Sequence, residues 1–403
     1  MPAFGEAIRE EFLLGPGVVQ VNNGSYGTLP KRVRDSQRRL LDEIEENADN
    51  YFRWKSIDLW KKCIAEVAEF VGANPENLCF VDNATTGVNT AVKSLHLGPG
   101  DALLANTWTY NPLKYCCRAV AEAGADLIWL PLKWPVESKE SVVGMFQEYL
   151  EKHPHIKVAI VDHITSATAT VMPIKEIISL CHKHGVVVII DGAHAPGQLN
   201  LNLEETGADF YTGNLHKWLF APRGCGFLYV HPKHHKIIHS TVTSVFYKNT
   251  TESWRLEFYW QGTRDNSACA ASVEGIKFHK YLGGMEALHE YNCKLLDDAV
   301  ALLVDAWDTE KFPIPREMEA PFMRLVRLPD MKCTEAMRGE TIMDDYTDIT
   351  VLMETIWQRY KLTTVTIYIQ GAPWVRLSAQ VYNTLDEYRV LAEAILALKA
   401  EGF

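Results

Sequence analysis

The fold of this chain is decided by the stretch Val186-Val187-Val188-Ile189-Ile190-Asp191-Gly192-Ala193-His194. Five consecutive β-branched apolar residues predict a strand that is buried on both faces and ends in a carboxylate. A second stretch, Gly213-Asn214-Leu215-His216-Lys217-Trp218, places Lys217 26 positions after Asp191. The two stretches predict a carboxylate at the end of a core strand and a lysine on a turn further along the chain.

Apolar strands alternate with amphipathic helices around this stretch. Strands are expected at 78–81, 102–105, 126–130 and 158–161, and helices at 86–96, 113–123, 140–152 and 174–184. Continuous apolar strands separated by helices are typical of a parallel sheet that is covered on both faces. The sequence therefore predicts an α/β fold.

The length of 403 residues predicts two domains, because a single hydrophobic core stops growing at roughly 250–300 residues. We expect an N-terminal arm over 1–22, a large domain over 23–268, and a long linking helix with a small C-terminal domain over 269–403. Outside the alternating region, helices are predicted at 30–72, 268–282, 288–307, 347–359 and 385–400, and strands at 322–328, 364–369 and 373–379.

Composition excludes several classes of function. The net charge of -11 argues against nucleic acid or an anionic membrane as a partner. No secretory signal and no run of about 18 apolar residues is visible. The nine cysteines form no CxxC pair, which fits reduced thiols in the cytoplasm better than disulfides. The histidines at 231–235 are interpreted as a solvated turn, so no metal site is expected.

Polar residues follow the expected strands at five places: Thr85, Tyr110, Thr165 with Ser166, Asp191 with His194, and Lys217. Open α/β sheets bind ligands at the carboxyl ends of their strands. A lysine can form a Schiff base with an aldehyde cofactor, and an aspartate can keep a pyridine nitrogen protonated. A helix that starts near Thr85 suits a phosphate, although any helix start has a similar pattern. Tyr110 fits either stacking on a flat ring or core packing.

These residues resemble the class V aminotransferase group of fold-type I pyridoxal phosphate (PLP) enzymes. The segments that carry the likeness are Asp191-Gly192-Ala193-His194 and Asn214-Leu215-His216-Lys217-Trp218. The likeness extends from Asn22 to Asn383 and is closest to the isopenicillin N epimerase-like branch, which includes cysteine desulfhydrases and C–S lyases of the ergothioneine pathway. It implies a large domain with a mostly parallel seven-stranded sheet and a smaller α+β C-terminal domain.

The resemblance also implies a role for individual residues. Lys217 would carry the Schiff base and Asp191 would contact the pyridine nitrogen. Positions expected to contact the cofactor elsewhere are His194 and Ser166 at the ring hydroxyl, Tyr110 on the ring face, and Thr85, Thr86, Asn214 and His216 around the phosphate. Thr263 would reach the phosphate of a neighbouring subunit, which implies a homodimer with shared sites. Arg376 would clamp the substrate carboxylate, because a guanidinium fork matches a carboxylate. Asn23 would line the substrate side.

One departure from the group narrows the expected reaction. Cysteine desulfurases of this class carry a nucleophilic cysteine shortly before the arginine, but residues 362–374 contain none. We therefore expect a C–S β-lyase acting on cysteine or a cysteine conjugate such as a sulfoxide, with Lys217 as the base and Tyr110 as an acid near the leaving group. Epimerisation, transamination and cyclisation begin with the same carbanion and remain alternatives, and so does a non-catalytic PLP-fold protein.

Overall fold

A seven-stranded sheet forms the centre of the computed structural model, which describes residues 2–248, 253–339 and 346–403. Its strands lie in the order β2 (Leu78–Val81), β8 (Gly226–Val230), β7 (Phe210–Asn214), β6 (Val187–Asp191), β5 (Ile156–Asp162), β3 (Ala102–Asn106) and β4 (Asp126–Leu130). The pairs from β7 to β4 are all parallel, and β8 is antiparallel to both of its neighbours. The predicted mostly parallel, seven-stranded sheet is confirmed.

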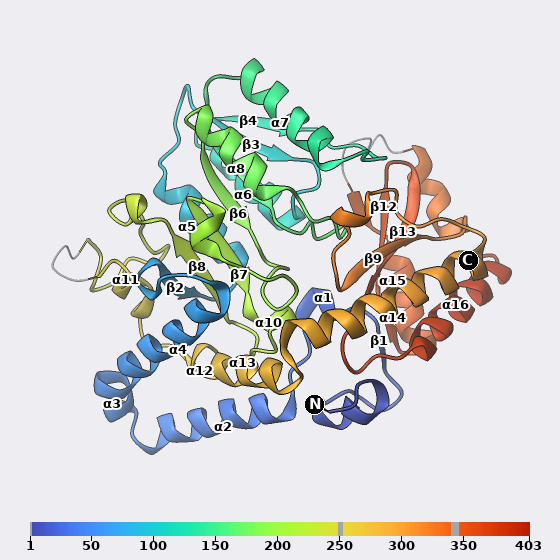
Figure 1. The fold of residues 1–403 in the computed structure, drawn as a ribbon, viewed down its shortest axis with the longest axis horizontal. Helices are drawn as coiled ribbons and strands as arrows, with labels where there is room; N and C mark the ends of the chain where they lie inside the picture. The colour runs from blue at the N-terminus through green and yellow to red at the C-terminus, as the bar shows by residue number, and fades with distance from the viewer. Residues whose placement is uncertain (1, 249–252, 340–345) are drawn as a thin grey trace.

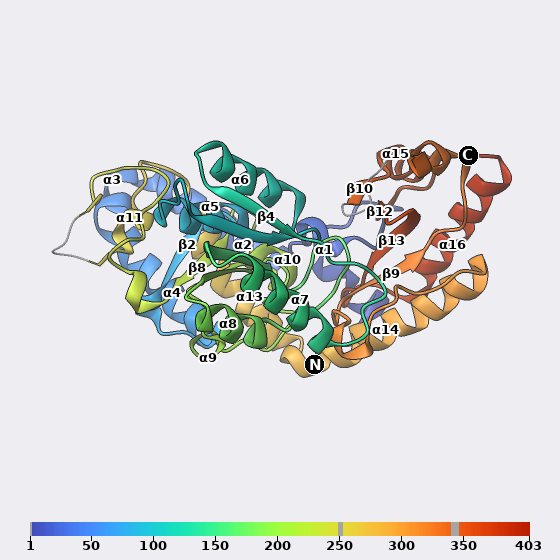
Figure 2. The ribbon, with the colours of Figure 1, turned by 90° about the horizontal axis from the view of Figure 1, so that it is seen from above.

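Helices pack on both faces of this sheet, as Figure 2 shows. On one face α5 (Ala84–Ser94) contacts β6 and β7, and α6 (Asn111–Glu122) contacts β3 and β4. On the other face α7 (Lys139–Lys152) and α8 (Ile174–Lys183) pack against each other and against β4 and β6 respectively. This arrangement leaves the carboxyl ends of the parallel strands open toward the C-terminal part of the chain (Figure 1).

The single helix expected over 30–72 is wrong. The structure has α2 (Lys31–Glu46), the short α3 (Ala48–Asn50), a π-helical turn over Tyr51–Lys55, and α4 (Ser56–Val71). The break comes at Asn47, whose backbone is extended and whose side-chain oxygen accepts a hydrogen bond from the Asn50 N–H at 2.9 Å. Asparagine is favoured at such helix starts because its side chain satisfies an N–H that has no helical partner.

The C-terminal part contains a four-stranded antiparallel sheet in the order β10 (Tyr346–Asp348), β12 (Val365–Ile369), β13 (Ala372–Ser378) and β9 (Met323–Arg327). The 24-residue helix α14 (Gly284–Trp307) runs from the large sheet to this sheet, and α15 (Thr350–Tyr360) and α16 (Leu385–Ala400) complete the layer. The helix predicted from 347 is wrong at its start, because Tyr346–Asp348 pairs with β12 instead. The domain boundaries given above remain predictions.

The remaining elements are short. The N-terminal arm joins the C-terminal part through β1 (Val19–Gln20), which pairs in parallel with β11 (Leu362–Thr363). The other helices are α1 (Asn23–Tyr26), α9 (Leu203–Thr206), α10 (Leu215–Trp218), α11 (Leu256–Tyr259), α12 (Ser267–Ala270), α13 (Ser272–Tyr281) and 3-10 turns at Gly5–Glu11, Pro75–Asn77, Pro232–His234, Arg316–Met318 and Lys332–Gly339. None of the helices within the described ranges has the length and apolar character needed to cross a membrane.

A hydrophobic cluster packs α10, which directly follows β7, against the small sheet. It contains Trp218 of the lysine turn, Phe322 and Met323 at the start of β9, and Ile367 and Trp374 of the small sheet. Burial of such aromatic and aliphatic groups is the main force that holds two layers together. The turn that carries Lys217 is therefore held between the two sheets.

Candidate active site

Five strand ends converge at the junction of the two sheets. The residues expected at these ends come from the loops or helix starts after β2, β3, β5, β6 and β7. Four of these strands, β7, β6, β5 and β3, are neighbours in the sheet, and the antiparallel β8 separates β2 from β7. The carboxyl ends of parallel strands meet at one edge of a sheet. The side chains that the sequence placed after separate strands therefore share one edge.

Lys217 is the central residue of the candidate site at this edge of the sheet. It lies in α10, directly after β7, and only 9% of its surface is exposed. Its Nζ lies 3.0 Å from Nε2 of His194. Burial lowers the pKa of Lys217 to about 7, and the positive charge of Arg376 acts in the same direction, whereas Asp191 opposes the change. A lysine with this pKa is largely a neutral amine just above neutral pH.

The tautomer of His194 supports a neutral amine. The indole N–H of Trp218, which can only donate, points at Nδ1 of His194 at 3.4 Å. A neutral His194 therefore carries its proton on Nε2 and can donate it to the lone pair of Lys217. Burial, together with the charge of Lys217, holds the pKa of His194 well below its ordinary value, so the ring stays neutral.

Two carboxyl groups lie side by side on adjacent strands, within electrostatic range of Lys217. Asp191 ends β6 and Asp162 ends β5, and they are register partners on adjacent strands. Burial raises the pKa of both, and the proximity of Asp191 raises that of Asp162 further. Asp191 accepts the N–H of Ala193 at 2.9 Å through Oδ1. Ionising both of these neighbouring buried carboxyl groups is unfavourable without a positive charge nearby. A cationic group bound beside Asp191 would therefore be stabilised.

The start of α5 lies against the lysine turn. The N–H of Ala84 donates to the side-chain oxygen of Asn214 at 2.9 Å, which ties this helix start to the end of β7. Gly87 permits the contact, because a Cβ there would overlap the side chain of Thr212 on β7. Thr85 and Thr86 are thus the residues that present the positive end of the helix to the site.

His216 flanks the same region. Its Nδ1 donates to the carbonyl oxygen of Cys225 at 3.2 Å, which leaves Nε2 as the free ring nitrogen. Burial, and then the charge of Lys217, lower the pKa of His216 to about 4. A phosphate at the start of α5 would have Asn214 and His216 on the lysine side and Thr85 and Thr86 on the helix side, and the roles of these four residues toward it remain predictions.

Arg376 approaches from the small sheet. It lies on β13, is 3% exposed, and donates through Nη1 to the carbonyl oxygen of Ser166 at 2.6 Å. Its Nη2 donates to Oδ1 of Asn22 at 3.1 Å and to Oγ of Ser25 at 3.0 Å. Its Nε is buried and has no hydrogen-bond partner among the described residues. A guanidinium held in this way has a free donor that an incoming carboxylate can take.

Asn23 lies beneath the lysine turn. Its side-chain N–H donates to the backbone carbonyl of Lys217 at 3.0 Å, and its oxygen accepts from the hydroxyl of Tyr382 at 3.3 Å. Both polar ends of this fully buried side chain are therefore engaged within the protein. Its expected place on the substrate side remains a prediction. The sequence analysis did not single out Asn22 and Ser25, which hold Arg376.

Tyr110 stands at the opposite side of the site. It is the residue before α6 and is 36% exposed, so its ring is accessible from the strand ends. Burial, and then the neighbouring Tyr26, raise the pKa of Tyr110, and Asp191 and Arg376 also act on it. The hydroxyl therefore stays protonated at neutral pH and can donate a proton.

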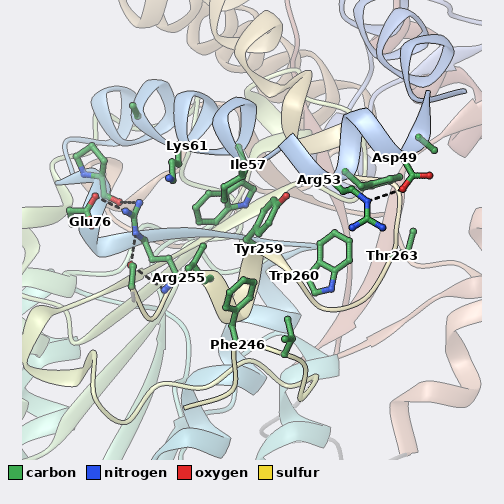
Figure 3. Close-up of a pocket in the computed structure, with 18 residues that line it drawn as sticks. Asp49, Arg53, Ile57, Lys61, Glu76, Phe246, Arg255, Tyr259, Trp260 and Thr263 are labelled. Atoms are coloured by element: carbon green, nitrogen blue, oxygen red, sulfur yellow. Dashed lines mark hydrogen bonds and ion pairs between the residues drawn. The ribbon is translucent and has the colours of Figure 1, made fainter. Parts of the chain in front are cut away.

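Thr263 is separate from these residues. It is exposed and lines a cavity of about 1260 Å³ with residues of α3, α4 and the segment that ends at Trp260. Figure 3 shows Trp260 and Tyr259 beside Thr263, with Arg53 and Asp49 on the facing helical turn. None of the contacts in the described part of the chain joins Thr263 to Lys217 or to the start of α5. Its role toward a neighbouring subunit remains a prediction.

Residues 27–325 match the family model described as Aminotransferase class-V, and this chain belongs to that family. Two relatives match nearly its whole length. The chain is 31% identical to "Putative L-cysteine desulfhydrase 1" of Oryza sativa subsp. japonica over 96% of this chain and 84% of the relative. It is 30% identical to "Isopenicillin N epimerase" of Streptomyces clavuligerus over 98% of both chains. The predicted family and branch are confirmed.

A solved structure supports the fold. The chain superimposes on the cystine C–S lyase C-DES, described in complex with its reaction product cysteine persulfide, with a TM-score of 0.78 and 19% identity over 94% of this chain and 97% of that one. Fold-type I is thereby confirmed.

The cofactor of this enzyme is pyridoxal 5'-phosphate, and the site fits it. A lysine amine, a buried carboxyl group, a helix start with two threonines and an accessible aromatic ring converge here at one sheet edge. These are the partners that the aldehyde, the ring nitrogen, the phosphate and the ring face require.

Proposed function

We propose that this enzyme is a carbon–sulfur β-lyase that acts on cysteine or on a cysteine conjugate such as a sulfoxide. The observation that carries the proposal is the buried position of Lys217, with Nζ 3.0 Å from Nε2 of His194 and its pKa lowered by burial to about 7, combined with the absence of cysteine from residues 362–374. A relative named as a cysteine desulfhydrase supports the same reaction class. Sulfur then leaves by elimination, since no thiol is present on that segment to accept it.

Each side chain has one task in this proposal. When bound, pyridoxal phosphate supplies an aldehyde for amines and a ring that makes the Cα proton of the amino acid acidic. Arg376 binds the α-carboxylate, and the amine of Lys217 removes the Cα proton as a general base. Tyr110 donates a proton to the departing sulfur. With cysteine, the balanced reaction consumes one water and yields pyruvate, ammonia and hydrogen sulfide.

The test is product formation by the purified holoenzyme. Cysteine, cystine and S-substituted cysteine sulfoxides are supplied in turn, and pyruvate is measured, with the Lys217→Ala enzyme as the control. Pyruvate from at least one of these substrates, and none from the control, is expected. Absence of pyruvate from all of them would refute the lyase.

Epimerisation is the second candidate, supported by the 30% identity to isopenicillin N epimerase. It begins with the same proton transfer by Lys217. It predicts exchange of the Cα hydrogen with solvent deuterium without loss of the Cβ substituent. Mass spectrometry of the recovered amino acid in deuterated buffer separates the two reactions.

We also propose that the enzyme is a homodimer in which Thr263 contacts the phosphate in the neighbouring subunit. Large apolar side chains are exposed in the segments that line the cavity shown in Figure 3. Val245 lines the cavity and is 74% exposed, and Trp54 at 64% and Tyr247 at 42% are the chain neighbours of the lining residues Arg53 and Phe246. Exposed apolar groups of this size on a globular protein often mark an interface. Analytical ultracentrifugation is expected to give a dimer, and Val245→Glu with Tyr247→Glu is expected to give monomers that bind the cofactor weakly. A monomeric wild-type enzyme would refute the shared site.

A cytoplasmic location is proposed as well. All nine cysteines are free thiols, and most are buried. Free thiols are typical of a reducing compartment. Fractionation of cells that express a tagged enzyme tests the location, and enrichment in an organelle fraction would contradict it.

A further inference from the structure

The inner face of the small sheet carries an acidic side chain that the proposed reaction does not use. Side chains alternate along a strand, so Tyr346 and Asp348 of β10 project to one face. Asp348 pairs with Ile367 of β12, and Ile367 pairs with Trp374 of β13, two residues before Arg376. Ile367, Trp374 and Arg376 therefore share a face with Asp348. Asp348 lies diagonally across two strand spacings from Arg376, about 10–12 Å between backbones.

This face is held against Tyr110. The N–H of Asn111, the residue after Tyr110, donates to the hydroxyl of Tyr346 at 2.9 Å, and Nζ of Lys114 lies 4.8 Å from the centre of the Tyr346 ring. These contacts hold β10 beside the start of α6. Asp348 is thereby placed on the same side of the site as the predicted acid.

No cationic side chain among the described residues forms an ion pair with the carboxyl group of Asp348. Its side chain is exposed to solvent and has no hydrogen bond or ion pair within the parts of the chain that the structure describes. Partial burial raises the pKa of Asp348, and the charge of Arg376 opposes this change, although the two groups form no salt bridge within the described residues. Two nitrogens of Arg376 already bind Ser166, Asn22 and Ser25. Tyr110 and Tyr346 also lie within electrostatic range of Asp348. An acidic group flanked by tyrosine rings attracts a cation.

The position matches the far end of a substrate. In the proposed function Arg376 binds the α-carboxylate, Lys217 removes the Cα proton and Tyr110 serves the leaving group, so the substituent on Cβ would lie on the Tyr110 side of the site. The geometry points to Asp348, with Tyr110, as a specificity subsite that favours amino acids whose sulfur substituent carries a cationic group and disfavours those with an acidic one. This inference rests on the proposed function, because it assigns the side chain of the substrate in the same site.

Three cysteine derivatives of similar size test the subsite: S-aminoethyl-cysteine, S-ethyl-cysteine and S-carboxymethyl-cysteine. The ratio of kcat/KM for the aminoethyl compound to that for the carboxymethyl compound is measured on the holoenzyme and on Asp348→Asn. The ratio is expected to fall several-fold in the variant, with about 25-fold as the upper bound. An exposed charge pair contributes up to about fivefold, and the variant loses both the attraction to the aminoethyl compound and the repulsion of the carboxymethyl compound. Asp348→Glu is expected to retain the preference. Asp386→Asn, which removes one exposed negative charge from α16, is the matched control and should leave the ratio unchanged.

Several outcomes would overturn the subsite. One is a ratio of kcat/KM values that is the same in Asp348→Asn and in the wild-type enzyme. Another is an equal change in kcat/KM for all three substrates, which would mean that Asp348 acts only through Arg376. If none of the compounds yields pyruvate, the proposed lyase fails separately. The subsite is then judged from the affinities of the three amino acids, measured by titration of the cofactor absorbance. Affinities that do not order with charge, or an order that Asp348→Asn leaves intact, would overturn it.

Discussion

Replacing Lys217 with methionine is expected to stabilise the cofactor-free enzyme at neutral pH. The folded protein lowers the pKa of this lysine from 10.5 to about 7 through burial. The unfolded chain therefore holds one more proton than the folded chain between these values. Stability of the wild-type protein consequently rises with pH across this window, and the full cost of the buried amine applies below about pH 7. A methionine side chain of similar shape carries no such cost.

The size of the effect follows from the pKa difference. A change from 10.5 to about 7 corresponds to an upper bound of about 5 kcal/mol, at about 1.4 kcal/mol for each pKa unit. Relaxation of the site and the lost hydrogen bond to His194 reduce this, so we expect a gain of about 2–4 kcal/mol near pH 6.5. The gain should shrink toward zero near pH 10.5.

Urea unfolding followed by tryptophan fluorescence measures the difference at both pH values. Lys294→Met is the matched control, because this lysine is 75% exposed on α14 and its ion-pair partner, Asp298, is also on the surface. Its effect is expected to stay within about 0.5 kcal/mol at either pH. A stability difference for Lys217→Met that is the same at both pH values would show that the lysine is not held neutral by the fold.

Three further changes have clear expected outcomes. Arg376→Lys keeps the charge but loses the fork, so KM for cysteine should rise at least about tenfold in steady-state assays, and an unchanged KM would remove the predicted carboxylate clamp. Gly27→Ala places a Cβ against the carbonyl oxygen of His216 and should lower both the melting temperature and the cofactor occupancy. Gly17→Ala has the same sign of φ but open space, so it should cost only about 1 kcal/mol; equal losses would contradict the steric argument. Asp209→Asn should destabilise the fold by about 2–4 kcal/mol at neutral pH. Burial raises the pKa of this carboxyl, but hydrogen bonds, among them those from His234 and the N–H of Val188, outweigh burial and hold the pKa well below its ordinary value in the folded state. The difference should therefore shrink progressively as the pH falls below about 4 and vanish only below the folded-state pKa; denaturant unfolding at neutral pH and at a series of acidic pH values checks this.

The elements with regular local patterns were predicted well from sequence. The strand at 126–130 and the helix at 385–400 have the predicted bounds, because their apolar period and flanking residues are unambiguous. Elements that depend on distant partners were predicted poorly. Strand β10 was taken for a helix start, since three residues with no apolar period become a strand only by pairing with β12. The interruption at Asn47 was missed because apolar residues continue on both sides of it.

The candidate site divides in the same way. Lys217 and Asp191 could be recognised because each sits in a short, distinctive stretch after an apolar strand. The side chains that position the lysine turn and Arg376 could not be recognised from the sequence. Asn23 reaches the carbonyl of Lys217 across 194 positions, and Asn22 reaches Arg376 across 354. No local pattern predicts a hydrogen bond between segments so far apart.

The sequence by itself determined the class of fold, the lysine, the carboxylate beside it and the absence of a cysteine before Arg376. Only the tertiary structure decided the protonation states and the neighbours. The register of β5 and β6 puts Asp162 beside Asp191, and the burial of α10 between two sheets lowers the pKa of Lys217. The physical reason is that desolvation and charge interactions depend on the distances between segments, whereas strands and helices are specified largely by neighbouring residues.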